Sequence, residues 1–248
     1  MKGTAFITGA TSGFGEAIAR ALSREGYKIV ALARRKERLE ALAKELGNTH
    51  IIVADIRDKK AVFDGVANLP QEFRDIEVLV NNAGLALGLE GVAETSIEDF
   101  ETMVDTNIKG FLYSTKAVLP LMIAQKSGYI FNLGSTAGAW PYSGSHVYGA
   151  SKAFVKQFSR DLRNDIRGTG IRVTEIAPGI CKTEFSEVRF GGDKVKADAV
   201  YEGVEYITAE DIAQIVLNCL NMPHRVNINV VEAMATQQTW AGLFIEKK

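Results

Sequence analysis

The sequence predicts an α/β fold, in which a doubly wound parallel sheet of about seven strands carries helices on both faces. Short apolar, β-prone runs alternate with segments whose apolar residues repeat at helical spacing. The first run is followed by a glycine-rich turn and a helix, and no linker interrupts the alternation over 248 residues. Such an alternation favours parallel strands joined by right-handed helical crossovers. We therefore expect residues 1–248 to form a single domain.

The first strand-turn-helix unit has the pattern of a dinucleotide-binding turn. The strand Thr4 to Thr8 leads into Gly9-Ala10-Thr11-Ser12-Gly13-Phe14-Gly15, and a helix follows from Glu16 to Glu25. Gly9 permits the tight turn, Gly13 lets the backbone approach a ligand, and Gly15 lets the helix sit close to the sheet. Free N–H groups at the helix start favour a diphosphate. A glycine-rich stretch alone is often only a flexible loop, but this one has the required strand before it and helix after it.

Basic residues follow the second strand, Lys28 to Ala33, where an NAD-binding unit places an acid on the ribose hydroxyls. Arg34, Arg35 and Lys36 stand there instead, before a helix from Lys36 to Leu46. Cations at a helix start oppose its macrodipole, so helix stability does not explain them. The 2′-phosphate of a bound NADP(H) would explain these cations, and we therefore predict a preference for NADP(H) over NAD(H). The alternative is an ordinary solvated basic patch.

The remaining elements continue the alternation. Thr95 or Ser96 provides an N-cap with acids in the following turn, and Gly168 and Pro178 mark element ends. The expected strands are Ile51 to Ala54, Val78 to Val80, Tyr129 to Leu133, Ile171 to Ala177 and Ile228 to Val231; the expected helices are Lys59 to Asn68, Ser96 to Gln125, Tyr148 to about Arg167, and Ala209 to Asn221. Ligands of such sheets bind beyond the carboxyl ends of the strands. Residues at six such ends should therefore face one crevice: Gly9, Arg34, Asp55, Asn82, Ser135 and Pro178.

Tyr148 and Lys152 stand four residues apart, which places both side chains on one face of a helix. A phenol has a pKa near ~10, and bringing it to about 7 requires roughly 4 kcal/mol. An ammonium at ~4 Å in an effective dielectric of about 20 contributes on the order of 4 kcal/mol. The pair is therefore a candidate general acid/base. Tyr and Lys also fall four residues apart by chance on many amphipathic helices. In that case the phenol is only half buried and the amine is solvated, and neither has a catalytic role.

Composition excludes several classes of function. The net charge of -1, with scattered basic residues, offers no field for nucleic acid. No apolar run reaches membrane-spanning length, and the N-terminus shows no signal-peptide pattern, so we expect a cytoplasmic protein. Cys181 and Cys219 lack metal or redox spacing, and the three histidines form no ligand cluster. We expect no metal site and reduced thiols.

Several motifs together resemble the short-chain dehydrogenase/reductase family, a Rossmann-like fold, over essentially the whole chain. The motifs are Thr8 to Gly15, Asp55, Asn81-Asn82-Ala83-Gly84, Asn107, Ser135, Tyr148, Lys152 and Pro178-Gly179. Three stretches are similar to NADP-dependent 3-hydroxy acid dehydrogenases that also take serine and allo-threonine: Asn82 to Gly88, Gly138 to Tyr142 and Thr183 to Arg189. Very similar stretches occur in sulfoacetaldehyde reductases, which form isethionate, and the sequence does not separate the two.

The resemblance implies a catalytic role for four residues. Tyr148 would exchange a proton with the substrate oxygen as hydride moves to or from the nicotinamide. Lys152 would lower the pKa of the phenol and bind the nicotinamide ribose, and Ser135 would polarise the substrate oxygen. Asn107 would hold a water that links Lys152 to solvent. A strand-end serine that caps a loop, and a helical asparagine that is bonded locally, are the plain alternatives.

The resemblance also implies the cofactor contacts. The expected contacts are Gly9, Thr11, Ser12, Gly13, Phe14, Gly15, Arg34, Arg35, Asp55, Ile56, Asn82, Ala83, Gly84, Tyr148, Lys152, Pro178, Gly179, Ile180 and Thr183. Asp55 would accept from the adenine amino group and Ile56 would pack on that ring, although an Asp at a strand end often only caps a turn. The segment Ile180 to Thr183 is one residue shorter than the corresponding loop in the hydroxy acid dehydrogenases.

Substrate choice should depend on a lid, residues 184–205, and on Trp140 to His146. Arg189 is the candidate for the substrate's carboxylate or sulfonate, because its planar fork suits either. The competing interpretation is a surface ion pair with Glu187 or Glu184. His146 either lines the pocket or is a satisfied loop residue.

Two further functions stay open alongside that of a small-molecule oxidoreductase. A reductase of carrier-bound 3-oxoacyl groups would need a basic docking patch beside the crevice. The nearly neutral net charge of the chain disfavours such a patch. A dinucleotide sensor without chemistry would not need Ser135, Tyr148 and Lys152 together.

The apolar C-terminal segment, residues 234–248, is expected at a subunit interface of a homotetramer or homodimer.

Overall fold

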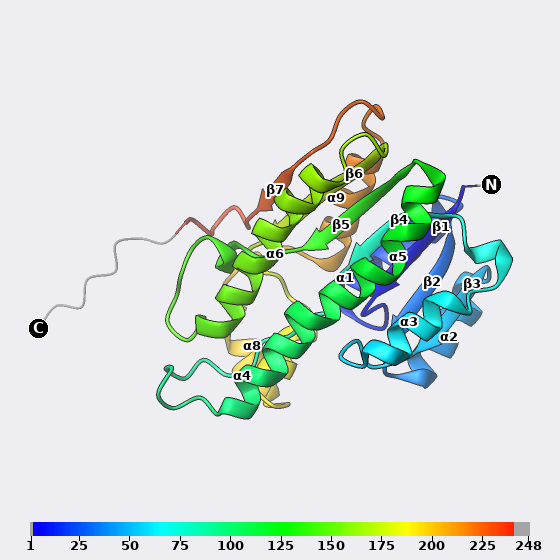
Figure 1. Cartoon of the computed structure of the whole chain (residues 1–248). Helices are drawn as coiled ribbons and strands as arrows, with labels where there is room; N and C mark the ends of the chain where they lie inside the picture. The colour runs from blue at the N-terminus through cyan, green and yellow to red at the C-terminus, as the bar shows by residue number, and fades with distance from the viewer. Residues whose placement is uncertain (1, 241–248) are drawn as a thin grey trace, which may run out of the picture.

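The computed structural model, which describes residues 2–240, contains one seven-stranded sheet in which every paired strand is parallel. The strand order is β3-β2-β1-β4-β5-β6-β7, so the direction of the order reverses between β1 and β4. The strands are β1 (Thr4–Thr8), β2 (Lys28–Ala33), β3 (Thr49–Val53), β4 (Ile76–Asn81), β5 (Gly128–Leu133), β6 (Ile171–Pro178) and β7 (Val230–Ala233). The predicted α/β fold class is confirmed (Figure 1).

Helices connect the strands and cover both faces of the sheet. They are α1 (Gly13–Arg24), α2 (Lys36–Leu46), α3 (Lys59–Ala67), α4 (Ile97–Val104), α5 (Phe111–Gln125), α6 (His146–Asp165), α7 (Phe185–Arg189), α8 (Lys194–Ala199) and α9 (Ala209–Leu220). Three short segments accompany them: η1 (Gln71–Phe73), the π-helical η2 (Asp105–Gly110) and η3 (Thr136–Gly138). Within residues 2–240, no helix has both the length and the apolar character needed to cross a bilayer.

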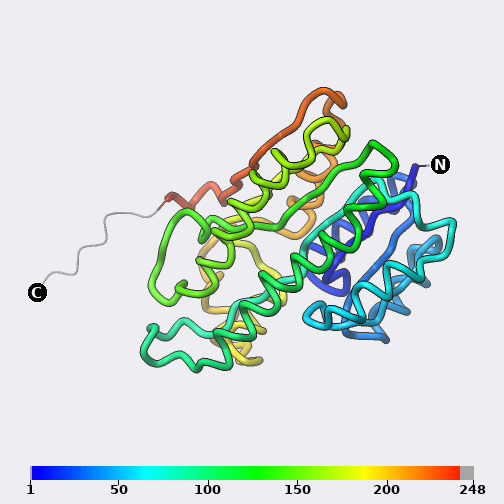
Figure 2. Tube along the Cα trace, viewed as in Figure 1, coloured from blue at the N-terminus to red at the C-terminus, as the bar shows by residue number. Residues whose placement is uncertain are grey.

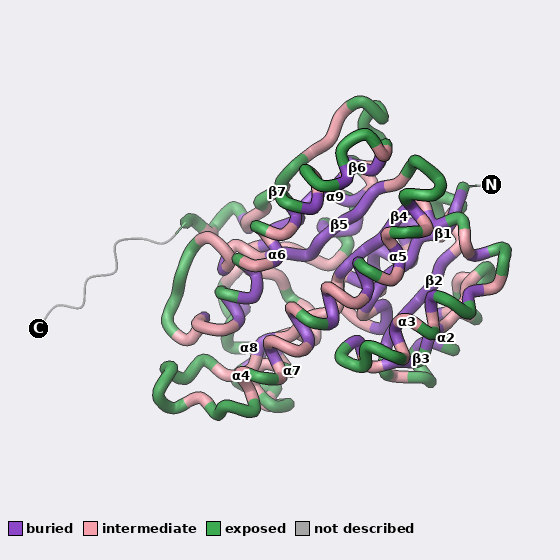
Figure 3. Tube along the Cα trace, viewed as in Figure 1, coloured by how far each residue is buried: buried purple, intermediate pink, exposed green. Residues whose placement is uncertain are grey.

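Two apolar cores lie on opposite faces of the sheet, because successive strand residues point to opposite sides. Ile7 and Ala31 pack with α1, α2 and α9, whereas Phe6 and Val30 pack with α3, α5 and α6. The strands have near-continuous apolar sequences because both faces are buried. Figure 3 shows this buried centre beneath an exposed outer surface. Each fully buried Ile, Val or Phe contributes about 1.5–3 kcal/mol, so the cores fix the strand positions firmly.

The predicted helix from Ser96 to Gln125 is a composite of α4, η2 and α5. Ser96 is its N-cap and accepts from the Asp99 N–H at 3.1 Å. Figures 1 and 2 show the three segments running on as one rod. The wide π turn in its middle contains the buried Asn107, and such turns occur often at functional sites.

Element boundaries differ from the sequence prediction at the carboxyl half. Strand β7 begins at Val230 rather than Ile228, and α6 begins at His146, two residues before Tyr148. The segment expected to form a lid contains the short helices α7 and α8 after β6. The C-terminal segment is described only to Trp240, whose indole Nε1 donates to Glu232; residues 241–248 lie outside the described part.

Candidate active site

One crevice collects the carboxyl ends of the central strands, at the reversal of strand order between β1 and β4. Residues of all six predicted strand ends line it. The lining includes Gly9, Thr11, Ser12, Gly13, Phe14, Arg34, Arg35, Asp55, Ile56, Asn82, Ala83, Gly84, Ser135, Tyr148, Lys152, Pro178, Gly179 and Thr183. The sequence therefore predicted correctly that these segments meet. A crevice at this place is where open α/β sheets bind their ligands.

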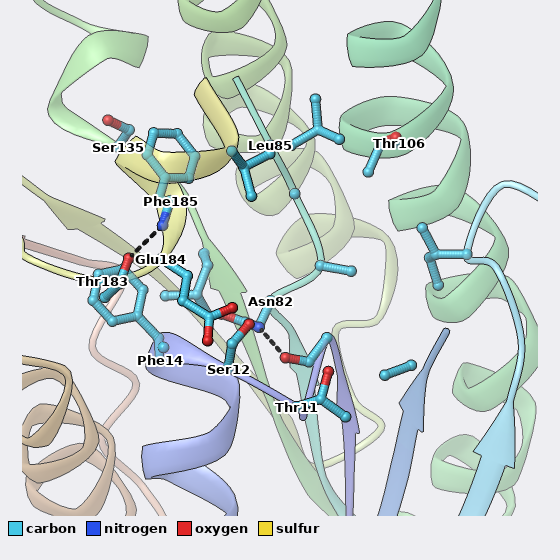
Figure 4. Close-up of a pocket in the computed structure, with 18 of the residues that line it drawn as sticks. Thr11, Ser12, Phe14, Asn82, Leu85, Thr106, Ser135, Thr183, Glu184 and Phe185 are labelled. Carbon is cyan, nitrogen blue, oxygen red and sulfur yellow. Dashed lines mark hydrogen bonds between the residues drawn. The ribbon is translucent and has the colours of Figure 1, made fainter. Parts of the chain in front are cut away.

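The glycine turn is held close to the end of β4. Gly9 and Gly13 adopt φ values of 67° and 53°, which glycine tolerates without strain. The Asn82 Nδ2 donates to the carbonyls of Thr8 and Gly9 at 2.9 and 3.2 Å (Figure 4). A Cβ at Gly15 would lie 2.5 Å from this amide nitrogen, so Gly15 serves the close packing of turn and strand and does not line the crevice.

Two arginines lie at the end of β2, as predicted, and a third joins them from α2. The Arg34 side chain is 63% exposed, with its guanidinium 3.7 Å from the Asp55 carboxylate. Arg35 donates to Ser12 Oγ at 2.8 Å and pairs with Glu184 at 2.9 Å. Arg38 pairs with the same carboxylate at 2.6 Å. These cations lie around the glycine turn, where a 2′-phosphate would need them.

Asp55 is shared between two arginines, which the sequence prediction missed. Arg57 donates to both carboxylate oxygens at 2.7–3.1 Å. Hydrogen bonding from Arg57, followed by the Arg34 charge, holds the pKa of Asp55 below its usual value. The carboxylate therefore stays ionised at neutral pH and keeps lone pairs to accept a further donor.

The predicted catalytic residues come from β5 and α6. Ser135 is separated from the end of β5 by one residue, Gly134, and its hydroxyl accepts from the Ala137 N–H at 3.1 Å. Tyr148 and Lys152 are buried on α6, where Lys152 Nζ donates to the Leu133 carbonyl at 2.8 Å. Gly138 brings η3 against α6, because a Cβ there would lie 2.8 Å from the Lys152 carbonyl carbon. Close packing of these two segments therefore holds the serine and the phenol at one end of the crevice.

The electrostatics of Tyr148 differ from the expectation that Lys152 lowers the pKa of the phenol. Burial raises the pKa of Tyr148 to about 12, and Ser135 and the Arg189 charge only partly offset it. Burial lowers the pKa of Lys152 to about 8, while the Glu175 carboxylate acts in the opposite direction. The lysine Nζ lies 5.8 Å from the Tyr148 ring centroid and is bonded to a carbonyl. The protein alone thus keeps the phenol protonated, ready to donate.

Asn107 is bonded directly to protein groups. Its Nδ2 donates to the Leu85 carbonyl at 2.8 Å and to Ser151 Oγ at 3.0 Å, and its Oδ1 accepts from the Leu85 N–H at 2.8 Å. It is buried and does not line the crevice, although a Cβ at Gly84 would lie 3.3 Å from its Oδ1 and 3.4 Å from Lys152 Nζ. Asn107 therefore fixes the loop after β4 beside Lys152. A water on this asparagine stays a prediction.

Arg189 lies inside an aromatic box formed by Tyr142, Tyr148 and Phe185. Its guanidinium carbon is 5.2 Å from the ring centroids of Tyr148 and Phe185 and 5.8 Å from that of Tyr142. Nη2 donates to the Tyr142 hydroxyl at 2.8 Å. Nε is buried and has no hydrogen-bond partner among residues 2–240. The alternative ion pair with Glu184 or Glu187 is wrong, since Glu184 pairs with Arg35 and Arg38 and no acid within the described chain pairs with Arg189.

Two other expected residues have different surroundings. Ile180 does not line the crevice; its N–H donates to Gln238 Oε1 at 2.7 Å. The ring of His146 is satisfied by Thr95 Oγ1 and the Glu90 carbonyl, both at 3.2 Å from Nε2, and it packs on Phe100. His146 is therefore a packed helix-start residue. Across residues 2–240, no three His, Cys, Asp or Glu side chains gather as a metal site would require.

Sequence reasoning missed several lining residues, among them Leu85, Cys181, Phe185 and Val188. Phe185 follows the predicted Thr183 closely, and its N–H donates to the Thr183 hydroxyl at 3.2 Å. Phe185 and Ser135 both line the crevice, and Figure 4 shows Glu184 pointing back toward Ser12. Its closeness to Thr183 in the sequence could have indicated that Phe185 lines the crevice. Nothing in the sequence around Glu184 indicates that it pairs with Arg38 of α2.

Comparison with known proteins agrees with this geometry. The family model described as short chain dehydrogenase matches residues 3–192. An NADP-dependent 3-hydroxy acid dehydrogenase of Salmonella typhi is 53% identical over 243 residues, which is 97% of this chain and 98% of that protein. Sulfoacetaldehyde reductase 2 of Chromohalobacter salexigens is 48% identical over 251 residues, with both chains fully covered.

A solved structure has nearly the same fold. The closed form of a serine dehydrogenase complexed with NADP+ superposes with a TM-score of 0.96 at 49% identity, covering 99% of this chain and 100% of that one.

Proposed function

The chain belongs to the short-chain dehydrogenase family and is an NADP-dependent oxidoreductase acting on CH–OH groups, and we propose that it interconverts a small 3-hydroxy acid and the corresponding carbonyl compound. The substrates we propose are serine, allo-threonine or 3-hydroxypropionate, which pair a reacting hydroxyl with an anionic end. Relatives about 50% identical are named for such reactions.

The half-buried guanidinium of Arg189 beside Tyr148, whose Nε is shielded from solvent, carries this proposal. Transfer of a cation into an apolar box is unfavourable unless a partner compensates for it. The Tyr142 hydroxyl satisfies Nη2 only, and the buried Nε has no partner within the described chain. A carboxylate or sulfonate accepts two parallel hydrogen bonds from such a fork. The anionic end of the substrate would complete the site, with its hydroxyl or carbonyl directed to Tyr148.

The residues of the crevice fit a 2′-phosphorylated dinucleotide. Gly9 and Gly13 open the backbone at the start of α1, where a diphosphate gains from free N–H groups. Arg34, Arg35 and Arg38 supply the charge for a 2′-phosphate. Asp55 and Ile56 line the crevice where adenine would lie, and Pro178, Gly179 and Thr183 line it where the nicotinamide would lie.

The chain's own groups supply the proton transfer and the positioning. When bound, the cofactor supplies or accepts the hydride. Tyr148 donates its proton to the substrate oxygen in reduction and takes it back in oxidation. Ser135 donates to the same oxygen and polarises it. Lys152, held by the Leu133 carbonyl, keeps a positive charge beside the phenol and stabilises the phenolate formed when Tyr148 gives up its proton.

A second candidate is reduction of sulfoacetaldehyde to isethionate. The Arg189 fork accommodates a sulfonate as well as a carboxylate, and one relative with full coverage carries that name. A carrier-bound 3-oxoacyl substrate is disfavoured because a net charge of -1 offers no strong basic docking field. A sensor without chemistry would not need the assembled Ser135, Tyr148 and Lys152.

The lid, the assembly and the location are part of the proposal. Residues 184–205 would close over the substrate, since α7 carries both Phe185 and Arg189 and the Gly88 N–H is bonded to the Arg189 carbonyl at 2.9 Å. We propose a homotetramer or homodimer in the cytoplasm. Size-exclusion chromatography with light scattering tests the assembly.

A substrate panel tests the reaction. Serine, allo-threonine, 3-hydroxypropionate and isethionate are compared in oxidation with NADP+, and sulfoacetaldehyde in reduction with NADPH, by kcat/KM. We expect the hydroxy acids to exceed isethionate in oxidation, and all reactions to be slower with the non-phosphorylated cofactor. Turnover restricted to the sulfonate pair would favour the second candidate, and turnover of neutral alcohols alone would refute both.

A further inference from the structure

A carboxylate lies buried behind the catalytic lysine. Glu175 is the fifth residue of β6 and is 1% exposed, and neither carboxylate oxygen has a hydrogen-bond partner among residues 2–240. A buried carboxylate without partners costs stability, so its position needs a reason. Neither the cofactor contacts nor the substrate contacts proposed above involve this residue.

The sheet register directs Glu175 toward α6. Glu175 is paired with Asn132 of β5, and residues paired on neighbouring strands point to the same face. The Asn132 Nδ2 donates to Ser159 Oγ on α6 at 2.9 Å. The Glu175 carboxylate therefore lies on the face that α6, with Lys152, covers.

The carboxylate and the lysine both lie at the carboxyl end of β5, and no direct hydrogen bond joins them among residues 2–240. A Cβ at Gly134 would lie 3.0 Å from the Glu175 Cγ, so the glutamate side chain lies directly over the Gly134 backbone. Lys152 Nζ is bonded to the carbonyl of Leu133, the residue before Gly134, and Ser135 is the residue after Gly134. The absence of a side chain at Gly134 leaves the space that this carboxylate occupies. The Glu175 side chain therefore lies against Gly134, and the Lys152 side chain is bonded to the residue before it, Leu133.

We propose that Glu175 is a positioning residue that holds the Lys152 side chain in its charged form against the end of β5. An ammonium buried in α6 loses hydration, and a carboxylate on the same face of the sheet compensates for that loss. This inference rests on the proposed reaction, in which the charge of Lys152 assists proton exchange at Tyr148 and binding of the nicotinamide ribose.

Other charged or titratable groups face this part of the structure. Those acting on Glu175, in addition to Lys152, are Lys156 and Arg160 of α6 and Glu232 of β7; those acting on neighbouring Tyr148 are Tyr142, Arg189 and Cys181. Burial raises the pKa of Glu175 to about 6, while Lys156, Arg160 and Lys152 lower it. Glu175 is therefore ionised at neutral pH, when Lys152 needs its counter-charge.

Glu175→Gln, which removes the charge and keeps the shape, tests the proposal through cofactor binding. The dissociation constant of NADPH is measured by nicotinamide fluorescence from pH 6 to 10. In the natural protein, binding should weaken as Lys152 loses its proton. In Glu175→Gln, the weakening should begin about one pH unit lower, because one nearby charge in an effective dielectric of about 20 has an effect of that order. An unchanged pH dependence would overturn the proposal.

A double-mutant cycle separates this role from packing. Lys152→Met should abolish the pH-dependent step, and adding Glu175→Gln to it should change nothing further. Glu175→Asp keeps the charge and should retain most of the natural profile; a shift as large as that of Glu175→Gln would indicate packing and refute the proposal. Glu210→Gln, which removes an exposed carboxylate from α9 that does not act on Glu175, is the control.

The binding measurement distinguishes failure of this inference from failure of the proposed reaction. NADPH binding reports the ionisation of Lys152 whether or not hydroxy acids are turned over. If no substrate in the panel reacts, the proposed function fails while the binding profiles still test Glu175. If substrates react and the profiles of Glu175→Gln and the natural protein coincide, only the role of Glu175 fails.

Discussion

The Arg189 guanidinium lies over the Tyr148 ring, 5.2 Å from its centroid, and its Nη2 donates to the Tyr142 hydroxyl at 2.8 Å. Arg189 belongs to α7 and Tyr148 to α6, so α7 brings a cation to the end of the crevice that contains Tyr148. A substrate held by this cation would have its hydroxyl within reach of the phenol.

Arg189→Met should raise KM for hydroxy acids by about 10- to 100-fold, because charge-assisted hydrogen bonds to a buried anion are lost. Neutral carbonyl compounds should keep their KM. Steady-state kinetics on both substrate classes measure the difference. Arg225→Met, at an exposed position outside the crevice, is the control. An equal change for neutral and anionic substrates would mean that Arg189 does not bind the anion.

Tyr148→Phe should lower kcat by about 100- to 10,000-fold, because general acid–base assistance disappears while the ring and its packing stay. The NADPH dissociation constant should change little, since the phenol hydroxyl is the only group removed. Stopped-flow absorbance of the nicotinamide measures the chemical step. Turnover that survives in Tyr148→Phe would assign the proton transfer to another group.

Carbonyl reduction should slow as the pH rises through about 8. The pKa of Lys152 lies at about 8, so its ammonium is present below that pH and lost above it. The pKa of Tyr148 is raised to about 12, so the phenol keeps its proton over the same range and does not cause the change. The pH profile of kcat/KM, with thermal unfolding at each pH as a check on folding, provides the measurement. A constant rate between pH 7 and 9 would contradict this assignment.

Replacing both Arg34 and Arg35 by Ala should raise KM for NADPH by about 10- to 100-fold and leave KM for NADH nearly unchanged. The reason is the loss of charge-assisted hydrogen bonds to a phosphate that only NADPH carries. Arg34 is the cleaner single substitution, because Arg35 also bonds Ser12 and Glu184. An equal loss for both cofactors would show that these arginines serve the fold.

Glu175→Gln should stabilise the protein at neutral pH by about 2 kcal/mol, because a pKa raised from 4.5 to about 6 corresponds to that free energy. The sign follows from protonation. Below pH 4.5 the folded and unfolded states are both protonated and Glu175 costs nothing; as the pH rises through 6 the folded state must hold a buried charge. Thermal unfolding at pH 4.5 and pH 7.5 should show a gain for the variant only at the higher pH. A gain at neither pH would argue that the Lys152 and α6 charges compensate fully.

Much of the site was predictable because local chemistry encodes it. The turn with Gly9 and Gly13 needs positive φ, which favours glycine wherever the turn occurs. Tyr148 and Lys152 share a helix face because they stand four residues apart. The meeting of the strand ends follows from a parallel sheet, which the alternation of strands and helices implies.

The contacts of Glu184 and Glu175, and the choice between the two interpretations of Arg189, were not predictable in the same way. Glu184 pairs with arginines nearly 150 positions away in the chain, instead of with its neighbour Arg189. His146 and Ile180 stand within predicted site segments, but distant Thr95 and Gln238 bind them. Sequence spacing gives no distance between residues on different elements, because crossover packing sets those distances.

The sequence by itself determined the alternation of elements, the glycine turn, the basic strand end and the spacing of the candidate acid/base pair. These depend on backbone periodicity and on the chemistry of individual side chains. Only the tertiary structure decided which charges face one another and how deeply they are buried, and hence that the Tyr148 phenol keeps its proton and that Glu175 lies behind Lys152. The physical reason is that pKa values and ion pairs depend on desolvation and distance across the folded chain, which arise only when β5, β6, α6 and α7 pack together.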